Sequence, residues 1–207
     1  MFGTGTKTRL LLYGAYGYTG RLTVELAAVK KLDVILAGRN KEALAGLGDR
    51  LGLPTRVVGL NDPGQLSEAL KDIACVAHMA GPFAITSAPM LSACLATQTN
   101  YIDITGEIEV FEAMWSRKEE IRRAGITAVP GAGFDVVPTD CLAGYVASKL
   151  ESPASLVIRA ARVRRRLSRY PAHRYSPSLP TCIVPASGSH RYPRRPLTSL
   201  DRFRFRR

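Results

Sequence analysis

The sequence contains few of the residues that hold metal ions or form disulfides. Its 207 residues include four cysteines and three histidines, with no Cys-x-x-Cys pair and no histidine at ligand spacing from another histidine or a cysteine. Three of the cysteines lie in apolar runs, as small core residues do. We therefore predict no metal site, and we expect reduced cysteines in a cytoplasmic protein.

The sequence also lacks the patterns of a signal peptide and of a membrane-spanning helix. Residues 1–7 are polar and contain no apolar core. The longest uncharged run, residues 73–102, is interrupted by Gly81-Pro82 and carries several polar residues, so a buried strand followed by a helix explains it better than a membrane span. We expect no transmembrane segment, and peripheral association with a membrane is left open.

Charge divides the chain into two parts. Residues 159–207 hold 14 of the 29 basic residues, all arginine, and one of the 17 acids, which gives that part a net charge of +13 and residues 1–158 a net charge of −1. The last 49 residues also contain six prolines and show no helical or strand periodicity. We predict an NAD(P)-binding domain over residues 1–158 and a disordered Arg/Pro-rich tail over 159–207.

Two origins of the tail remain open. An arginine-only basic segment is an unusual product of selection for charge alone, although selection for bidentate phosphate contacts would favour it. A shifted reading frame in a GC-rich gene also yields many Arg, Pro, Ser and Ala codons. We favour a frameshift or truncation, with a natural basic tail as the alternative.

Three glycines spaced three residues apart organise the N-terminal half. An apolar run at residues 10–13 is followed by Gly14, Gly17 and Gly20, and residues 21–29 then repeat apolar residues at helical spacing. This pattern predicts the strand, tight turn and helix that open a dinucleotide-binding fold. The glycines would allow a sharp turn, close approach of backbone amides to a diphosphate, and tight helix packing, while the helix N-terminus supplies free N–H groups.

Arg39 bears on which dinucleotide binds. The predicted strand at residues 33–38 ends in Arg39-Asn40, without the acidic residue that NAD-specific folds place there for the ribose 2′-hydroxyl. A guanidinium can instead donate two hydrogen bonds to a 2′-phosphate. We predict NADP as the cofactor, with NAD less favoured, and a solvated arginine at a helix start as the alternative reading.

Strands and helices alternate along the rest of the first 158 residues. This alternation predicts an α/β protein with a Rossmann-like, doubly wound parallel sheet. The further predicted strands are residues 55–58, 74–80, 101–104, 126–129 and one that begins at 155–158, and the predicted helices are 41–51, 63–70, 89–96, 110–123 and 138–150. We expect the helix at 110–123 to bury Phe111, Met114, Trp115 and Ile121.

Polar and glycine residues follow the later strands, at the edge where ligands bind in such sheets. Gly81 would let the nicotinamide half of a cofactor pass close to the backbone, although an ordinary turn is an equally good reading. A carboxylate at Asp103 within an apolar strand requires a partner or a place in the cleft. Glu107 and Asp135 are the other candidate polar groups, and His78 is more typical of a core histidine than of a catalyst.

Five motifs in order resemble the saccharopine dehydrogenase-like family. They are residues 13–20 (YGAYGYTG), 37–40 (AGRN), 81–83 (GPF), 101–107 (YIDITGE) and 130–140 (PGAGFDVVPTD). The closest branch contains saccharopine dehydrogenase NADP-binding-domain proteins and trans-acting enoyl reductases, and the resemblance covers about residues 8–160. It implies an NADP-dependent oxidoreductase with a Rossmann domain followed by a second α+β domain, and we expect that second domain to be missing from this chain.

The resemblance also assigns roles to residues. It implies a pyrophosphate loop formed by Gly14, Gly17, Tyr18, Thr19 and Gly20, a 2′-phosphate contact at Arg39, and a nicotinamide-side turn at Gly81 and Pro82. Tyr16 stands where relatives often have threonine, a departure that a loop using backbone amides should tolerate. No catalytic residue can be transferred.

Two functions from different classes follow. The first is an NADP-dependent oxidoreductase, or its cofactor-binding half, that reduces an enoyl or carbonyl group of a small-molecule or carrier-bound substrate. Nucleic acid is not an expected partner for it, and a homo-oligomer is left open. The alternative is a non-catalytic nucleotide-binding module whose basic tail binds nucleic acid or anionic lipid.

Overall fold

The computed structural model describes residues 7–134 and 136–149, in two units that divide between Gly133 and Phe134. The first unit carries the six strands that the structure describes, and the described part of the second carries helix α7 (Val137–Ala147), close to the predicted helix at 138–150. Asp135, the strand expected from residue 155, the domain boundary at 158 and the tail at 159–207 lie outside the described residues.

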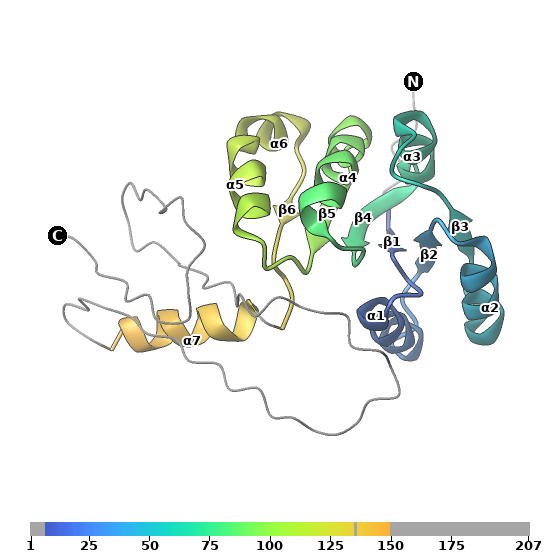
Figure 1. The fold of residues 1–207 in the computed structure, drawn as a ribbon, viewed down its shortest axis with the longest axis horizontal. Helices are drawn as coiled ribbons and strands as arrows, with labels where there is room; N and C mark the ends of the chain where they lie inside the picture. The colour runs from blue at the N-terminus through green and yellow to red at the C-terminus, as the bar shows by residue number, and fades with distance from the viewer. Residues whose placement is uncertain (1–6, 135, 150–207) are drawn as a thin grey trace. The chain divides into compact units, whose positions relative to one another are not determined.

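The first unit is built on one sheet of six parallel strands (Figure 1). Their spatial order is β3-β2-β1-β4-β5-β6, so the chain starts in the middle of the sheet, builds outward to one edge, and then returns to build the other half. This is the order of the doubly wound dinucleotide-binding folds, as predicted. The strands are β1 (Arg9–Tyr13), β2 (Val34–Gly38), β3 (Thr55–Val57), β4 (Ile73–His78), β5 (Asn100–Asp103) and β6 (Ala128–Val129).

Helices cover both faces of this sheet, which is why its central strands are near-continuous apolar runs. One core cluster joins Leu12 and Leu36 to residues of α1 and α2, and a second joins Leu11 and Val76 to α3, α4 and α5. In Figure 1, α1 and α2 accordingly lie on one side of the sheet and α3 to α6 on the other. The helices are α1 (Tyr18–Val29), α2 (Lys41–Leu51), α3 (Pro63–Leu70), α4 (Phe83–Thr97), α5 (Ile108–Ser116) and α6 (Lys118–Ala124).

Helix α4 begins earlier than the sequence predicted. We expected it to start at Pro89, because proline is favoured in the first turn of a helix. It starts instead at Phe83 and carries Pro89 inside it. No Ser, Thr, Asp or Asn side chain caps the first turn of α4. The acceptor for its first amides belongs to another element and is described below.

The predicted helix at 110–123 is two helices, and one of its expected core residues is exposed. The break falls at Arg117, whose backbone leaves the helical region. Val110 and Met114, four residues apart, form the buried face of α5, whereas Trp115 lies one residue further round and is 71% exposed. The Nζ atom of Lys118 lies 4.9 Å from the centre of its ring, so Trp115 makes a surface cation–π contact rather than a core contact.

The described residues contain no group of three possible metal ligands and no helix that is long and apolar enough to span a bilayer. Cys75, Cys94 and Cys141 are free thiols. Burial raises the pKa of the Cys94 thiol to about 12, so this cysteine is a neutral core residue. Cys182 lies outside the described residues.

Candidate cofactor-binding site

The chain turns sharply between β1 and α1, at the carboxyl edge of the sheet. Gly14 adopts a φ of +83°, a conformation that other residues rarely take, and its amide donates to the carbonyl oxygen of Ala37 on β2 at 2.8 Å. The amide of Gly17 donates to the carbonyl of Gly14 at 3.0 Å and closes the turn. The corner is therefore fixed to the neighbouring strand by its own backbone.

Two of the three glycines are required by close contacts. A Cβ atom at Gly14 would lie 2.9 Å from the Cβ of Ala80, just beyond the end of β4. A Cβ atom at Gly20 would overlap the Gly14 carbonyl oxygen and lie 3.0 Å from the Cα of Ala15. Gly14 thus permits contact between neighbouring strand ends, and Gly20 permits contact between helix and turn.

The neighbouring helices show how an N-terminus is normally completed. In α2 the Asn40 side chain accepts a hydrogen bond from the Ala43 amide at 2.9 Å, and in α3 the Asp62 carboxylate accepts one from the Gln65 amide at 2.9 Å. Each side chain satisfies an amide that has no partner within its helix.

Helix α1 has no such cap. Its N-cap residue is Gly17, which has no side chain, and the first turn contains no acidic residue. Among the described residues, the amides of Tyr18, Thr19 and Gly20 donate to no backbone or side-chain acceptor. Three free N–H groups at the positive end of a helix dipole form a site suited to an anion such as a diphosphate.

Arg39 lies one strand away, directly after the end of β2. It is exposed, and it makes no hydrogen bond or ion pair with another residue in the described part of the chain. It lies close enough to influence Tyr13, whose pKa is raised mainly by burial and further by Tyr16, with the Arg39 charge acting in the opposite direction. The Tyr16 ring covers Gly38, since a Cβ there would lie 2.6 Å from its Cε1 atom. Arg39 therefore presents an exposed guanidinium without a partner among the described residues, directly after the glycine that Tyr16 covers.

Gly81 and Pro82 form an exposed turn beside the glycine corner. The amide of Met79 donates to the carbonyl of Tyr13 at 2.8 Å, which holds the end of β4 against the end of β1. The predicted proximity of the Gly81-Pro82 turn to the first glycine turn is therefore present in the fold. Pro82 is the N-cap residue of α4 and offers no side-chain acceptor.

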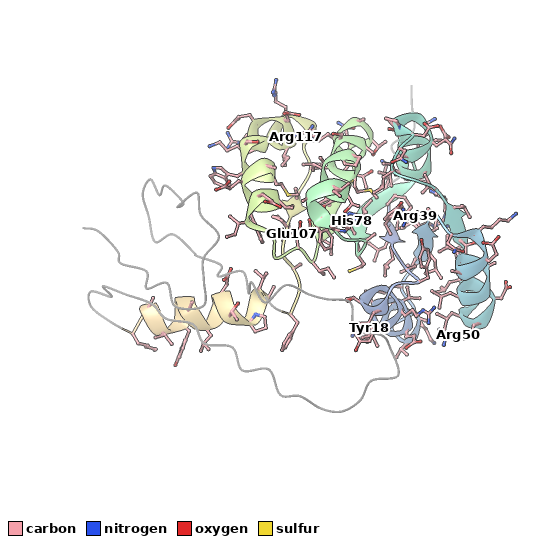
Figure 2. The ribbon with its side chains drawn as sticks, in the orientation of Figure 1. Tyr18, Arg39, Arg50, His78, Glu107 and Arg117 are labelled. Atoms are coloured by element: carbon pink, nitrogen blue, oxygen red, sulfur yellow. The ribbon has the colours of Figure 1, made fainter. Side chains whose placement is uncertain are left out.

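Glu107 supplies the side-chain acceptor that Pro82 lacks. One carboxylate oxygen accepts a hydrogen bond from the Phe83 amide at 2.9 Å, and the other accepts one from the Ala84 amide at 2.6 Å. Figure 2 shows Glu107 between α4 and α5. Glu107, one of the candidate polar groups, is therefore occupied in capping α4.

Asp103 is fully buried and fully bonded. Its Oδ1 atom accepts from the amides of Thr105 at 3.0 Å and Gly131 at 2.8 Å, and its Oδ2 atom accepts from the Tyr101 hydroxyl at 2.6 Å. The prediction that a carboxylate in this strand needs a partner is confirmed. These bonds connect the loops that follow β5 and β6, which is a structural role.

His78 is a core histidine, as its place in an apolar strand predicted. It has no exposed surface, and its ring lies 5.5 Å from that of Tyr13 and 5.4 Å from that of Phe83. Burial lowers its pKa to about 4, so the ring is neutral near pH 7. Its Nε2 atom lies 3.0 Å from the Thr86 hydroxyl, and Nδ1 has no partner among the described residues.

Sequence reasoning named Glu107 but missed its capping role, and it missed Thr86 altogether. Glu107 caps a helix that begins 24 positions earlier in the chain, and Thr86 donates from its hydroxyl to the Ala80 carbonyl at 2.7 Å. One signal pointed to the first of these. A helix that starts after Pro82 without a polar N-cap side chain requires an acceptor from elsewhere.

The fold is that of a Rossmann-like domain. It has six parallel strands in this order, helices on both faces of the sheet, and a helix after the first strand whose N-terminus has no side-chain cap. The chain belongs to the family of the saccharopine dehydrogenase NADP binding domain, whose model matches residues 10–129.

Curated relatives agree with this assignment. The chain is 29% identical over 168 residues to a saccharopine dehydrogenase-like oxidoreductase of Bos taurus, covering 72% of this chain and 39% of that protein. It is 30% identical over 139 residues to a trans-acting enoyl reductase of Mycobacterium leprae, covering 63% of this chain and 33% of that protein. The chain thus spans between a third and two fifths of the length of these relatives.

A solved structure shows the same fold. Saccharopine dehydrogenase (L-Glu forming) from Saccharomyces cerevisiae superposes with a TM-score of 0.61 at 20% identity, over 69% of this chain and 31% of that one. At this identity the likeness concerns the fold alone.

Proposed function

We propose that this chain is the NADP-binding part of an NADP-dependent oxidoreductase. One observation carries the proposal: within residues 7–134 and 136–149, the amides of Tyr18, Thr19 and Gly20 at the start of α1 have no acceptor and the Arg39 guanidinium one strand away has no partner. The match of residues 10–129 to an NADP binding domain supports it.

The residues at this edge fit NADP. The free amides of α1 would hold the diphosphate, and Gly14 and Gly17 keep the approach to them clear of side chains. Arg39 would hold the 2′-phosphate, which a planar guanidinium can bind through two parallel hydrogen bonds. Gly81 and Pro82 would flank the nicotinamide half.

NADPH, when bound, supplies a hydride to an electrophilic carbon, and the protein contributes binding and orientation. Asp103 and Glu107 already accept hydrogen bonds from backbone amides, so we assign neither as a proton donor. The trans-acting enoyl reductases among the relatives favour reduction of an enoyl or carbonyl group in a small-molecule or carrier-bound substrate.

Titration of the full chain with NADPH and with NADH, followed by nicotinamide fluorescence, tests the cofactor. We expect NADPH to bind at least about tenfold more tightly, equivalent to about 1.4 kcal/mol. Equal affinities would contradict the role of Arg39, and binding of neither would contradict the proposed function. Consumption of NADPH in the presence of an α,β-unsaturated thioester then tests the reaction.

A further inference from the structure

The first amides of α4 have a side-chain acceptor, whereas those of α1 have none among the described residues. Both helices begin after a strand at the same edge of the sheet, but the position left open at α1 is filled at α4 by the Glu107 carboxylate. Each of its oxygens takes one amide, so the carboxylate plane and the first turn of α4 are fixed relative to each other. The residue before that turn is Pro82.

Glu107 is itself held in place from the interior of the sheet. Its amide donates to the Thr105 hydroxyl oxygen at 3.1 Å, and the Thr105 amide donates in turn to Asp103. Thr105 and Asp103 have no exposed surface, and the same Asp103 oxygen accepts from Gly131. A continuous chain of hydrogen bonds therefore runs from the ends of β5 and β6 to the start of α4.

The Gly81-Pro82 turn is held from its other side by Thr86. The Thr86 hydroxyl lies 2.7 Å from the Ala80 carbonyl and 3.0 Å from the Pro82 carbonyl, so it donates its proton to a carbonyl and its oxygen can accept from a protonated Nε2 of His78. Thr86 therefore contacts the residues on both sides of Gly81 from within α4, whereas Glu107 holds the two residues that follow Pro82. Glu107 thus supplies a side-chain link between the end of this turn and the segment that follows β5.

We propose that Glu107 is a positioning residue that fixes the Gly81-Pro82 turn for the nicotinamide half of the cofactor. The inference rests on the proposed function, because it presumes a dinucleotide whose diphosphate lies at α1. In that arrangement the adenosine half would contact Arg39 and the glycine corner, and the corner is hydrogen-bonded to β2 and packs against Ala80 without contact to Glu107. Loss of the Glu107 bonds should therefore weaken one half of the cofactor site and leave the other intact.

Glu107→Gln in the full chain tests this assignment. The glutamine amide is similar in size, but it presents one acceptor oxygen and one NH₂ group to two amide donors. We would measure dissociation constants for NADPH and for adenosine 2′,5′-bisphosphate, which carries the 2′-phosphate and lacks the nicotinamide. NADPH should bind about tenfold more weakly, while the bisphosphate should change by less than about twofold.

Glu109→Gln is the matched control. Glu109 is exposed in the first turn of α5, and this substitution removes the same charge two residues away. It should change neither constant. If Glu107→Gln does not fold, Thr105→Val supplies the second variant, since it removes the acceptor of the Glu107 amide and keeps the carboxylate. Thr105→Val should also weaken the binding of NADPH, by a smaller factor than Glu107→Gln.

Three results would overturn the assignment. The first is an unchanged dissociation constant for NADPH in the variants. The second is an equal loss of affinity for NADPH and for the bisphosphate in Glu107→Gln. The third is a loss of NADPH affinity in Glu109→Gln as large as that in Glu107→Gln. A wild-type chain that binds neither compound would instead refute the proposed function, so the two failures are distinguishable.

Discussion

Gly20 lies directly against the carbonyl oxygen of Gly14. A Cβ atom at position 20 would overlap that oxygen and approach the Cα of Ala15 to 3.0 Å. The backbone of α1 therefore contacts the backbone of the turn directly, with no room for a side chain at position 20. This contact sets where the amides at the start of α1 point, so the spacing of the glycines also determines the geometry of the proposed diphosphate site.

Gly20→Ala should push α1 away from the turn. We expect a loss of about 1–3 kcal/mol in the free energy of unfolding, as for overpacked interiors, together with weaker NADPH binding. Gly46→Ala in α2 is the control, because nothing lies within 4 Å of a Cβ there. It should stabilise the protein by about 0.5–1 kcal/mol, since alanine favours the helix. Urea unfolding measures both, and equal effects of the two substitutions would contradict the contact.

Arg39→Ala should weaken the binding of NADPH by about 10- to 100-fold, because hydrogen bonds to a charged group contribute about that much to affinity. The affinity for NADH should change by less than about threefold. The side chain has no partner among the described residues, so its removal leaves no buried group unsatisfied. Arg122→Ala on the exposed surface of α6 controls for the loss of a positive charge. Parallel losses for NADPH and NADH in Arg39→Ala would remove the assigned role.

His78 should make stability depend on pH. Its pKa is lowered by burial from 6.5 to about 4, so between these values the unfolded chain binds a proton that the native chain does not. Stability should therefore fall as the pH is lowered through this window, by about 2–3 kcal/mol between pH 7 and pH 4.5.

His78→Gln isolates this contribution from the other titrating groups. The variant should be less stable at pH 7, because the packed ring and its bond to Thr86 are lost. The difference in stability from the wild type should then shrink as the pH falls. Denaturant unfolding at a series of pH values gives this difference directly, and a constant gap would show that His78 is not held neutral.

Asp103→Ala should be strongly destabilising, because it leaves two amides and the Tyr101 hydroxyl without their acceptor. A loss of about 3–5 kcal/mol is expected, and Asp103→Asn should cost less since one oxygen remains for the two amides. Asp33→Ala, which breaks only an exposed ion pair with Arg9, should cost less than about 1 kcal/mol. Thermal unfolding compares the three, and similar values for Asp103→Ala and Asp33→Ala would contradict the central role of Asp103.

The features predicted correctly from the sequence are those whose physical causes are local. The apolar runs of β1 and β2, the glycine turn between β1 and α1, and the Asp62-Pro63 start of α3 each depend on neighbouring residues. The alternation of these elements was enough to give the doubly wound sheet. The positions of the glycines and of Arg39 at its carboxyl edge followed from that topology.

The features that were missed have distant causes. The start of α4 at Phe83 depends on Glu107, and no residue near Pro82 reveals that acceptor. Trp115 was assigned to the core because it is large and apolar, but the face of α5 that packs is set by the position of α4. The need of Asp103 for a partner was predicted, but its partner Gly131 could not be named from the sequence because only the fold brings that residue beside it.

The central place of β1 in the sheet has a consequence for synthesis of the chain. Strand β1 pairs with β2 on one side and with β4 on the other, and Gly14 lies against Ala80. Strand β1 is thus synthesised well before β4, and until β4 emerges one apolar edge of β1 stays unpaired. A nascent chain that stalls before β4 would contain the glycine turn but lack Ala80, against which Gly14 packs.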